Sequence, residues 1–260
     1  MASLLRGAAF ITGAASGIGK ATAHSFARYG VTQLALADIN LARAEATAKE
    51  LQSQFPSITA IPLHIDTASE KSIDDAVAET AAHFGRIDYA VNNAGIGGSQ
   101  ALSADHELED WKRTLDVNLN GVWMSSRAQI RVMLGQEKRE DTPRHNRGVI
   151  INVASMYGTL SPSLNTPAIA YTASKHGVIG LTRADAVAYA LRGIRINAIC
   201  PGYVATPLIQ SSMQSGVIQR EIEKVPLGRL ATMEEIGDQI MVLASPLSSY
   251  VVGAEVVADG

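Results

Sequence analysis

A glycine-rich turn near the N-terminus limits the fold more strongly than any other feature of the sequence. It spans residues 12–19, between the apolar run 8–11 and a helical pattern over 20–29. The apolar run has the length and composition of a buried strand. A strand, a glycine turn and a helix start together form an anion site, because free amide N–H groups and the helix dipole face the same point. The turn therefore predicts a phosphate-binding unit of an α/β fold.

The three glycines of the turn have different expected tasks. Gly13 permits the tight turn, Gly17 allows close approach of a pyrophosphate, and Gly19 allows the helix to pack on the strand. The spacing differs from the pattern G-x-G-x-x-G, so an ordinary turn is the alternative. The residues expected to contact a dinucleotide here are Gly13, Ser16, Gly17, Ile18 and Gly19.

Apolar strands alternate with amphipathic helices along the rest of the chain. Further strands are predicted at 33–37, 60–65, 87–91, 149–153, 194–199 and 254–257. Further helices are predicted at 41–54, 69–84, 111–133, 171–191 and 233–243. This alternation predicts an α/β fold with a doubly wound parallel sheet of about seven strands and helices on both faces. Ligands of such sheets bind beyond the carboxyl ends of the strands, where the polar motifs of this chain gather.

Asp38 follows the second strand, about 20 residues after the glycine turn, where a ribose 2′-hydroxyl is held in dinucleotide folds. A carboxylate accepts hydrogen bonds from the diol and repels a 2′-phosphate, so Asp38 favours NAD over NADP, and its neighbour Ile39 is a further expected cofactor contact. Two alternatives are open. Asp38 caps the next helix, a task for which Asn40 competes, or Arg43 turns in to hold the 2′-phosphate of NADP.

Tyr171 and Lys175 lie four residues apart on a predicted helix and share one face. A cation at ~4 Å with a dielectric of ~20 contributes about 4 kcal/mol, roughly three pKa units. We therefore expect Lys175 to lower the pKa of Tyr171 toward neutrality, where proton transfer is efficient. An exposed helix contact is the alternative explanation. Ser155 lies upstream at a strand end, and Ser161 and Ser163 compete for its role.

Several motifs in order resemble the short-chain dehydrogenase/reductase family over almost the whole chain. They are the turn Thr12-Gly13-x3-Gly17-x-Gly19, the segment Asn92-Asn93-Ala94-Gly95, the tetrad Asn118, Ser155, Tyr171 and Lys175, and the pair Pro201-Gly202. The resemblance implies a single-domain Rossmann fold over residues 1–260. It also implies reversible hydride transfer between NAD(H) and a secondary alcohol or ketone.

The resemblance implies a role for each member of the tetrad. Tyr171 exchanges the proton, Ser155 holds the substrate oxygen, and Lys175 lowers the phenol pKa and binds the nicotinamide ribose. Asn118 holds a water that links Lys175 to solvent. Further cofactor contacts are implied at Asp66 and Thr67 for adenine, Asn93, Ala94 and Gly95 for the adenosine ribose, and Pro201, Gly202, Val204 and Thr206 for the nicotinamide.

The predicted substrate is bulky and mostly apolar. The expected lining of its pocket is Ile96, Ser155, Met156, Tyr157, Leu160, Tyr203 and Leu208. Residues 159–167 form a loop that is longer than the family norm. Residues 204–226 occupy the place of the family's substrate lid, although helix packing or subunit contact explains their apolar side chains equally well.

Composition excludes several functions. The net charge is −3 and no long basic run occurs, so no nucleic-acid surface is predicted. No apolar stretch is long enough for a membrane span, and the single cysteine, Cys200, forms no internal disulfide. We expect a cytoplasmic protein without a metal, and the resemblance implies a homo-oligomer, a tetramer or a dimer. The polar stretch 135–147 is interpreted as a solvated excursion.

Two other functions compete with an NAD-dependent dehydrogenase. One is an NADPH-dependent ketoreductase of a biosynthetic pathway on the same scaffold. The other is a non-catalytic dinucleotide-binding scaffold, which has no use for an activated Tyr171. A Ser–Lys hydrolase built on Ser155 and Lys175 leaves the glycine turn and Asp38 unexplained.

Overall fold

The computed structural model describes residues 3–140, 142–209 and 217–260. Seven parallel strands form one sheet in the order β3-β2-β1-β4-β5-β6-β7. The strands are β1 (Gly7–Thr12), β2 (Val31–Asp38), β3 (Thr59–His64), β4 (Tyr89–Asn92), β5 (Gly148–Val153), β6 (Ile194–Pro201) and β7 (Glu255–Ala258). The doubly wound sheet is confirmed, and each predicted strand agrees with the structure to within two residues at both ends.

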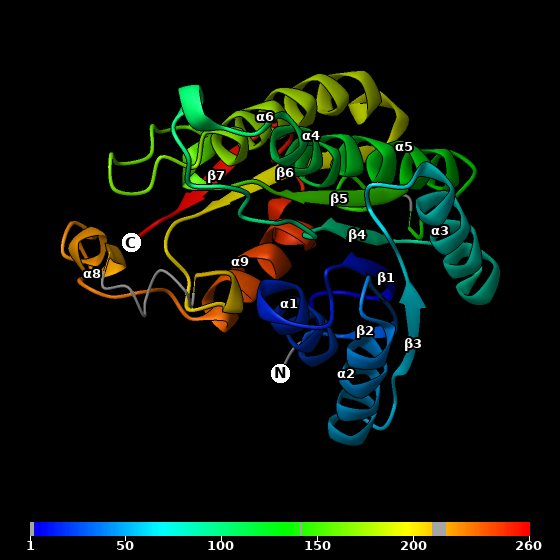
Figure 1. The fold of residues 1–260 in the computed structure, drawn as a ribbon. Helices are drawn as coiled ribbons and strands as arrows, with labels where there is room; N and C mark the ends of the chain where they lie inside the picture. The colour runs from blue at the N-terminus through cyan, green and yellow to red at the C-terminus, as the bar shows by residue number, and fades with distance from the viewer. Residues whose placement is uncertain (1–2, 141, 210–216) are drawn as a thin grey trace.

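Helices cover both faces of the sheet (Figure 1). They are α1 (Gly17–Arg28), α2 (Leu41–Gln54), α3 (Glu70–Phe84), α4 (Leu108–Leu115), α5 (Gly121–Leu134), α6 (Ile169–Tyr189), α8 (Val217–Ile222) and α9 (Met233–Ala244). Helices α1, α2 and α9 contribute to the core on one face, and α3, α5 and α6 to the core on the other. Among the described residues, no helix combines the length and the apolar character needed to cross a bilayer.

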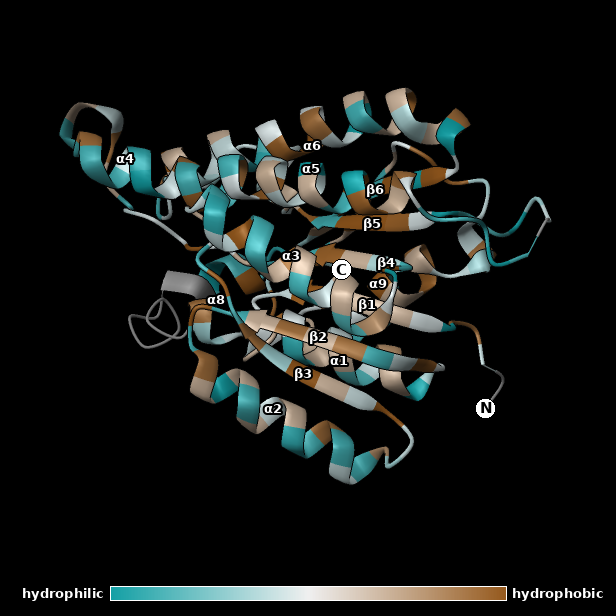
Figure 2. Cartoon of the chain, turned by 90° about the vertical axis from the view of Figure 1, so that its right-hand side faces the viewer, coloured by the Kyte–Doolittle hydropathy of each residue, from teal (hydrophilic) through white to brown (hydrophobic). Residues whose placement is uncertain are grey.

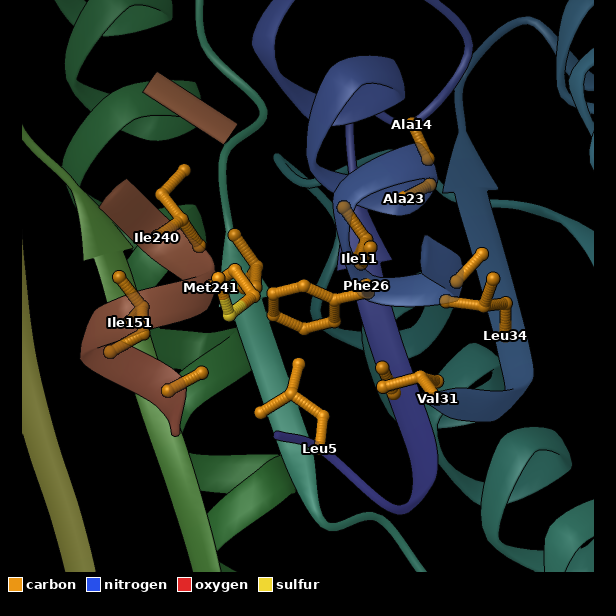
Figure 3. Close-up of a cluster of buried hydrophobic side chains, with 14 of the residues drawn as sticks. Leu5, Ile11, Ala14, Ala23, Phe26, Val31, Leu34, Ile151, Ile240 and Met241 are labelled. Carbon is orange, nitrogen blue, oxygen red and sulfur yellow. The ribbon is translucent and has the colours of Figure 1, made fainter. Parts of the chain in front are cut away.

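The central strands are buried on both faces, as expected for a parallel sheet between two helical layers. Along β1, Ala9 and Ile11 join one core while Ala8 and Phe10 join the other, because successive side chains alternate across a strand. In Figure 3, Phe26 of α1 lies among apolar side chains from the sheet and α9. The hydropathy colouring of Figure 2 shows apolar strands between helices whose surfaces carry most of the polar residues.

The helix predicted over 111–133 differs from the structure in two ways. It begins earlier, at Leu108, and it is interrupted by a π-helical turn at Asp116–Asn120. In that turn the N–H of Gly121 donates to the carbonyl of Asp116, five residues back. Such turns hold one extra residue and are frequent at functional sites. The π-helical turn carries Asn118, one of the predicted catalytic residues.

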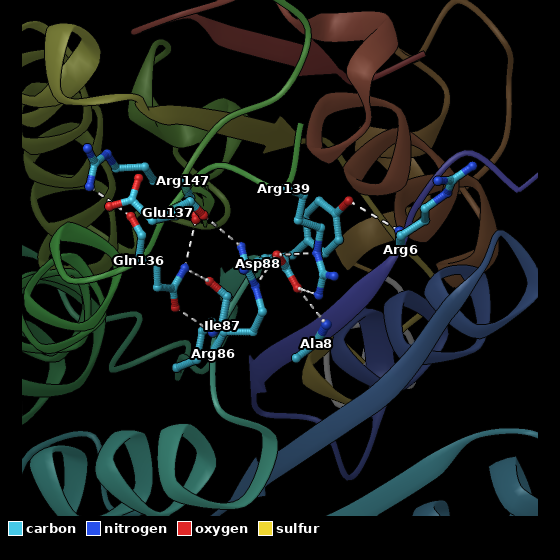
Figure 4. A network of polar contacts seen from close by, with 10 residues as sticks. Arg6, Ala8, Arg86, Ile87, Asp88, Gln136, Glu137, Arg139 and Arg147 are labelled. Atoms are coloured by element: carbon cyan, nitrogen blue, oxygen red, sulfur yellow. Dashed lines mark hydrogen bonds and ion pairs between the residues drawn. The ribbon is translucent and has the colours of Figure 1, made fainter. Parts of the chain in front are cut away.

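The stretch 135–147 is not the simply solvated excursion that we expected (Figure 4). The side chain of Gln136 is buried, and it hydrogen-bonds both the N–H and the C=O of Ile87, at 2.7 and 3.0 Å. Arg139 forms an ion pair with the buried carboxylate of Asp88 (2.7 Å). These polar bonds attach the excursion to the chain that enters β4, so part of it stabilises the fold.

Candidate active site

The carboxyl ends of the strands open into a cavity of about 860 Å³. Every predicted site residue except Gly19, Asn118 and Leu160 lines its wall. Most of the predicted residues thus lie around one cavity at the sheet edge where ligands of parallel sheets bind. No group of three or more His, Cys, Asp or Glu side chains within residues 3–140, 142–209 and 217–260 is arranged to hold a metal ion.

The glycine turn has the backbone that an anion site requires. Gly13 and Gly17 adopt positive φ angles of 66° and 58°, which residues with a Cβ rarely tolerate. A Cβ on Gly17 would have no neighbour closer than 3.8 Å, the methyl carbon of Thr206. It would occupy the space beside the first turn of α1, where a bound group can approach the backbone. A Cβ on Gly19 would instead overlap the carbonyl oxygen of Gly13. Gly19 therefore has the packing role, and its contact with a cofactor stays a prediction.

Thr12 and Asn93 tie the glycine turn to the end of β4. The hydroxyl of Thr12 accepts from the N–H groups of Asn93 and Ala94, both at 3.0 Å. The amide of Asn93 donates to the carbonyls of Thr12 (3.0 Å) and Gly13 (3.2 Å). The side chain of Asn93, which follows β4, thus stabilises the conformation of the glycine turn at the end of β1.

Asp38 turns its carboxylate toward the same corner of the cavity. One oxygen accepts from the N–H of Ala15 in the glycine turn (3.0 Å), and the other accepts from the N–H of Asn40 (2.9 Å). The cap of α2 is Asn40, whose side chain accepts from the N–H of Arg43 (3.1 Å). The capping alternative for Asp38 is therefore excluded. Arg43 itself is exposed and lies outside the cavity wall.

Lys175 of α6 is buried and lines the cavity wall. Its Nζ donates to the carbonyl of Val153 at the end of β5 (2.8 Å) and lies 5.4 Å from the ring centroid of Tyr171. Burial lowers the pKa of Lys175 to about 8. Ser155, directly after β5, accepts the N–H of Tyr157 (3.1 Å) and lines the cavity. The competing residues Ser161 and Ser163 lie outside its wall.

The pKa of Tyr171 is raised, in contrast to the lowering that we expected from the Tyr–Lys pair. Burial is the largest cause, and side-chain hydrogen bonding with Ser155 acts in the opposite direction. Desolvation penalises the charged phenolate. The ammonium lies over the ring and donates to Val153, so its position does not compensate for the loss of water.

Asn118 is fully buried and does not line the cavity. Its side-chain oxygen accepts from the N–H of Ile96, and its amide donates to the C=O of the same residue, each at 2.8 Å. A Cβ on Gly95 would lie 3.2 Å from that oxygen and 3.7 Å from Nζ of Lys175. The side chain of Asn118 therefore positions the segment after β4, next to Lys175. The water that we expected it to hold stays a prediction.

At the substrate end of the cavity, one residue predicted to line the wall does not, and several residues that were not predicted do. Leu160 is 52% exposed and lies outside the wall, so its assignment is wrong. The described part of the lid segment contributes Leu208 and Ile209, while Met213 lies outside the described residues. The additional wall residues not predicted from the sequence include Gln100, Arg113, Val117, Thr166 and Ala168. Arg113 and Val117 lie four residues apart, the spacing of one helix face, but neither lies three or four residues from Asn118, so no signal in the sequence pointed to them.

Sequence comparison assigns the family. A family model described as Enoyl-(Acyl carrier protein) reductase matches residues 13–260. A protein named short-chain dehydrogenase fogB, from Aspergillus ruber, is 40% identical over 98% of this chain and 96% of its own. The chain belongs to the short-chain dehydrogenase/reductase family. It is therefore an oxidoreductase of a family that binds a nicotinamide dinucleotide.

Other members of the family resemble the chain over nearly its full length. A cyclohexanol dehydrogenase from an Acinetobacter species is 36% identical over 97% of this chain and 93% of its own. The crystal structure of a levodione reductase superposes with a TM-score of 0.89 at 32% identity, covering 97% of this chain and 96% of that one. The shared architecture includes the strand ends that form the cavity.

Proposed function

We propose that the chain catalyses reversible hydride transfer between NAD(H) and a bulky, mostly apolar secondary alcohol or its ketone. The reaction class follows from the family, and the proposed preference for NAD rests on the carboxylate of Asp38. Both of its oxygens are oriented by backbone N–H groups at the corner beside the glycine turn. The cationic side chains of the described cavity wall, Arg113 and Lys175, belong to elements after β4, whereas Asp38 ends β2. A carboxylate without an adjacent cation accepts a ribose diol and repels a 2′-phosphate.

The residues around the turn fit a dinucleotide. Gly17 leaves room beside the backbone, and Ser16 at the N-cap of α1 makes no side-chain capping bond within the described structure. The first N–H groups of α1 are thus available to a phosphate. Asp38 and Ile39 would hold the adenosine ribose, Asp66 and Thr67 the adenine, and Val204 and Thr206 the nicotinamide end. When bound, the nicotinamide ring accepts or supplies the hydride.

The chain's own residues handle the proton. The raised pKa keeps the phenol of Tyr171 protonated at neutral pH, ready to donate to a ketone oxygen, and oxidation uses the same group as the base. The hydroxyl of Ser155 accepts from Tyr157, which leaves its own proton for the substrate oxygen. Lys175 uses one of three N–H donors on Val153 and retains two for ribose hydroxyls.

The substrate class follows from the wall and from the relatives. Ile96, Met156 and Leu208 present apolar surface next to Tyr171 and Ser155. Cyclohexanol dehydrogenase and levodione reductase are named for a cyclic alcohol and a ketone reduction, which supports a ring-containing substrate here. We assign the segment 204–226 as the substrate lid, of which residues 204–209 and 217–226 are described and Val204, Thr206 and Leu208 line the cavity.

Cofactor titration tests the proposal. Binding of NADH and NADPH is followed by cofactor fluorescence in the wild type, in Asp38→Asn and in the charge-matched control Glu45→Gln, an exposed residue of α2. We expect tighter NADH than NADPH binding, a loss of roughly tenfold or more in NADH affinity for Asp38→Asn, and no change for Glu45→Gln. Tighter NADPH binding would favour the ketoreductase and implicate Arg43. Cofactor binding without turnover of any secondary alcohol or ketone would favour the non-catalytic scaffold.

We further propose that the protein is a homo-oligomer, through the helices that carry Asn118 and Tyr171. Large apolar side chains stand exposed on these helices, including Leu108, Trp123 and Val187 at 61, 46 and 80%. Light scattering at several concentrations gives the assembly mass, and a monomeric mass throughout would contradict the proposal.

A further inference from the structure

Three hydroxyl groups meet at the substrate end of the cavity. The hydroxyl of Tyr157 lies 2.7 Å from that of Tyr203 and 3.3 Å from that of Thr166. All three residues line the cavity wall. They come from different segments, since Tyr157 follows β5, Tyr203 follows β6 and Thr166 belongs to the loop 159–167. We call these three residues the hydroxyl cluster.

The hydroxyl cluster retains hydrogen-bonding capacity for a ligand. A hydroxyl has one proton to donate and two acceptor sites. If Tyr157 donates the hydrogen bond, the proton of Tyr203 is free to bond a ligand. If Tyr203 donates it, the acceptor sites of the Tyr203 oxygen are free instead. Burial raises the pKa of Tyr203, with its hydrogen bond to Tyr157 acting in the same direction, so the group stays neutral. The cluster can therefore bind a hydroxyl or a carbonyl oxygen, and it has no charge with which to select an ion.

The loop 159–167 holds Thr166 through its own hydrogen bonds. The hydroxyl of Ser163 lies 3.3 Å from that of Thr166 and accepts from the N–H of Asn165 at 3.3 Å. The N–H of Thr166 donates to the carbonyl of Ser163 at 3.0 Å. These bonds within the loop hold Thr166 at the cavity wall.

The ring of Tyr157 lies between the hydroxyl cluster and Tyr171, the proposed proton-transfer residue. The ring of Tyr157 packs edge to face on Tyr171, with centroids 6.5 Å apart, and on Tyr203, with centroids 6.4 Å apart. A substrate that places its reacting oxygen at Tyr171 and Ser155 has its distal part near Tyr203. The apolar residues Met156 and Leu208 belong to the same wall. Polar groups therefore mark two ends of an otherwise apolar site.

We propose that the hydroxyl cluster binds a second oxygen atom of the substrate, an alcohol or carbonyl oxygen remote from the reacting carbon. The favoured substrates are oxygenated cyclic alcohols and ketones rather than hydrocarbon rings with a single oxygen. We assign Tyr203 as the specificity-determining residue, because it lines the wall and its hydroxyl, bonded to Tyr157 at 2.7 Å, retains a proton or acceptor sites for the substrate. This inference rests on the proposed function, since it concerns the substrate of the same reaction.

Paired substrates test the inference. The probes are cyclohexane-1,4-diol and cyclohexanol, and kcat/KM for the diol is halved to correct for its two equivalent hydroxyls. The proteins are the wild type, Tyr203→Phe, Tyr157→Phe and the control Tyr250→Phe, a fully exposed tyrosine far from the cavity wall. We expect the wild type and Tyr250→Phe to prefer the diol by roughly tenfold, the value of one good hydrogen bond. We expect Tyr203→Phe to bring the ratio close to one, whatever its absolute activity.

Direct binding separates this inference from the proposed function. Thermal-shift titration of the NADH complex with each probe gives the ratio of the two Kd values without turnover. If no alcohol is oxidised but the diol binds more tightly in a Tyr203-dependent way, the proposed reaction fails and the hydroxyl cluster stands. If the wild type shows no preference for the diol in either assay, or Tyr203→Phe keeps the full preference, the inference is overturned.

Discussion

Replacing Lys175 by methionine isolates the electrostatic contribution of the buried ammonium to proton transfer. Nζ lies 5.4 Å from the ring centroid of Tyr171. At that distance, a dielectric of ~20 gives about 3 kcal/mol of attraction to a phenolate, or roughly two pKa units. Because the cation stabilises the charged phenolate, its removal raises the pKa of Tyr171 further. Oxidation needs the phenolate, so Lys175→Met should lose roughly a hundredfold in oxidation rate at pH 7.

The assay is the pH profile of kcat for alcohol oxidation at saturating cofactor. Below about pH 8 the rate of Lys175→Met should lie roughly a hundredfold under that of the wild type, a pH-limited gap that a general loss of folding would not produce. Lys175→Arg keeps a permanent charge and should hold the profile near that of the wild type. Burial lowers the pKa of Lys175 to about 8, so above pH 8 the wild type also loses the ammonium and the gap between the two profiles should narrow. A rising limb that coincides in wild type and Lys175→Met below pH 8 would refute the electrostatic role.

Three further perturbations address other parts of the site and the fold. Gly17→Ala should weaken NADH binding roughly tenfold in a fluorescence titration. A left-handed φ costs a residue with a Cβ about 1–2 kcal/mol, and the added methyl group enters the cavity. An unchanged affinity for NADH would argue against a phosphate site at this turn. Tyr171→Phe should keep the Kd for NADH and lower turnover at least ~100-fold, and an active variant would exclude Tyr171 as the acid–base group. Asp88→Asn should lower the free energy of unfolding by about 3 kcal/mol in urea, because two guanidinium groups lose their carboxylate; a midpoint equal to the wild type would contradict this account of the excursion.

The positions of the strands and most of the cavity wall were accessible from the sequence, because burial patterns repeat locally and strand ends meet at one rim. The sign of the pKa shift at Tyr171 was not, since it depends on how completely the fold excludes water from the phenol. The path of the loop 159–167 was equally hidden. It turns Thr166 toward the cavity and Leu160 away, and neither composition nor spacing encodes that choice.

The helical run from Leu108 to Leu134 shows another limit. Its apolar pattern is continuous enough to predict one helix, whereas the π-helical turn at Asp116–Asn120 changes only which carbonyl each N–H meets. The residue types in the sequence do not indicate whether a backbone N–H bonds the carbonyl four or five residues back. The role of Asn118 was therefore predicted from the resemblance, while its bonds to Ile96 emerged only from the structure.

That π-helical turn also restricts which insertions and deletions the sequence can accept. One residue more or less rotates the downstream part of a helix by about 100°. Deleting one position from Asp116–Asn120 would restore regular helical bonding, but it would swing buried residues of α5 such as Ala128 and Met133 away from the sheet. An ancestor without the extra residue would have needed a different buried face on α5. The extra residue and the buried face of α5 therefore depend on each other, so a single-residue length change here is expected to disrupt the core.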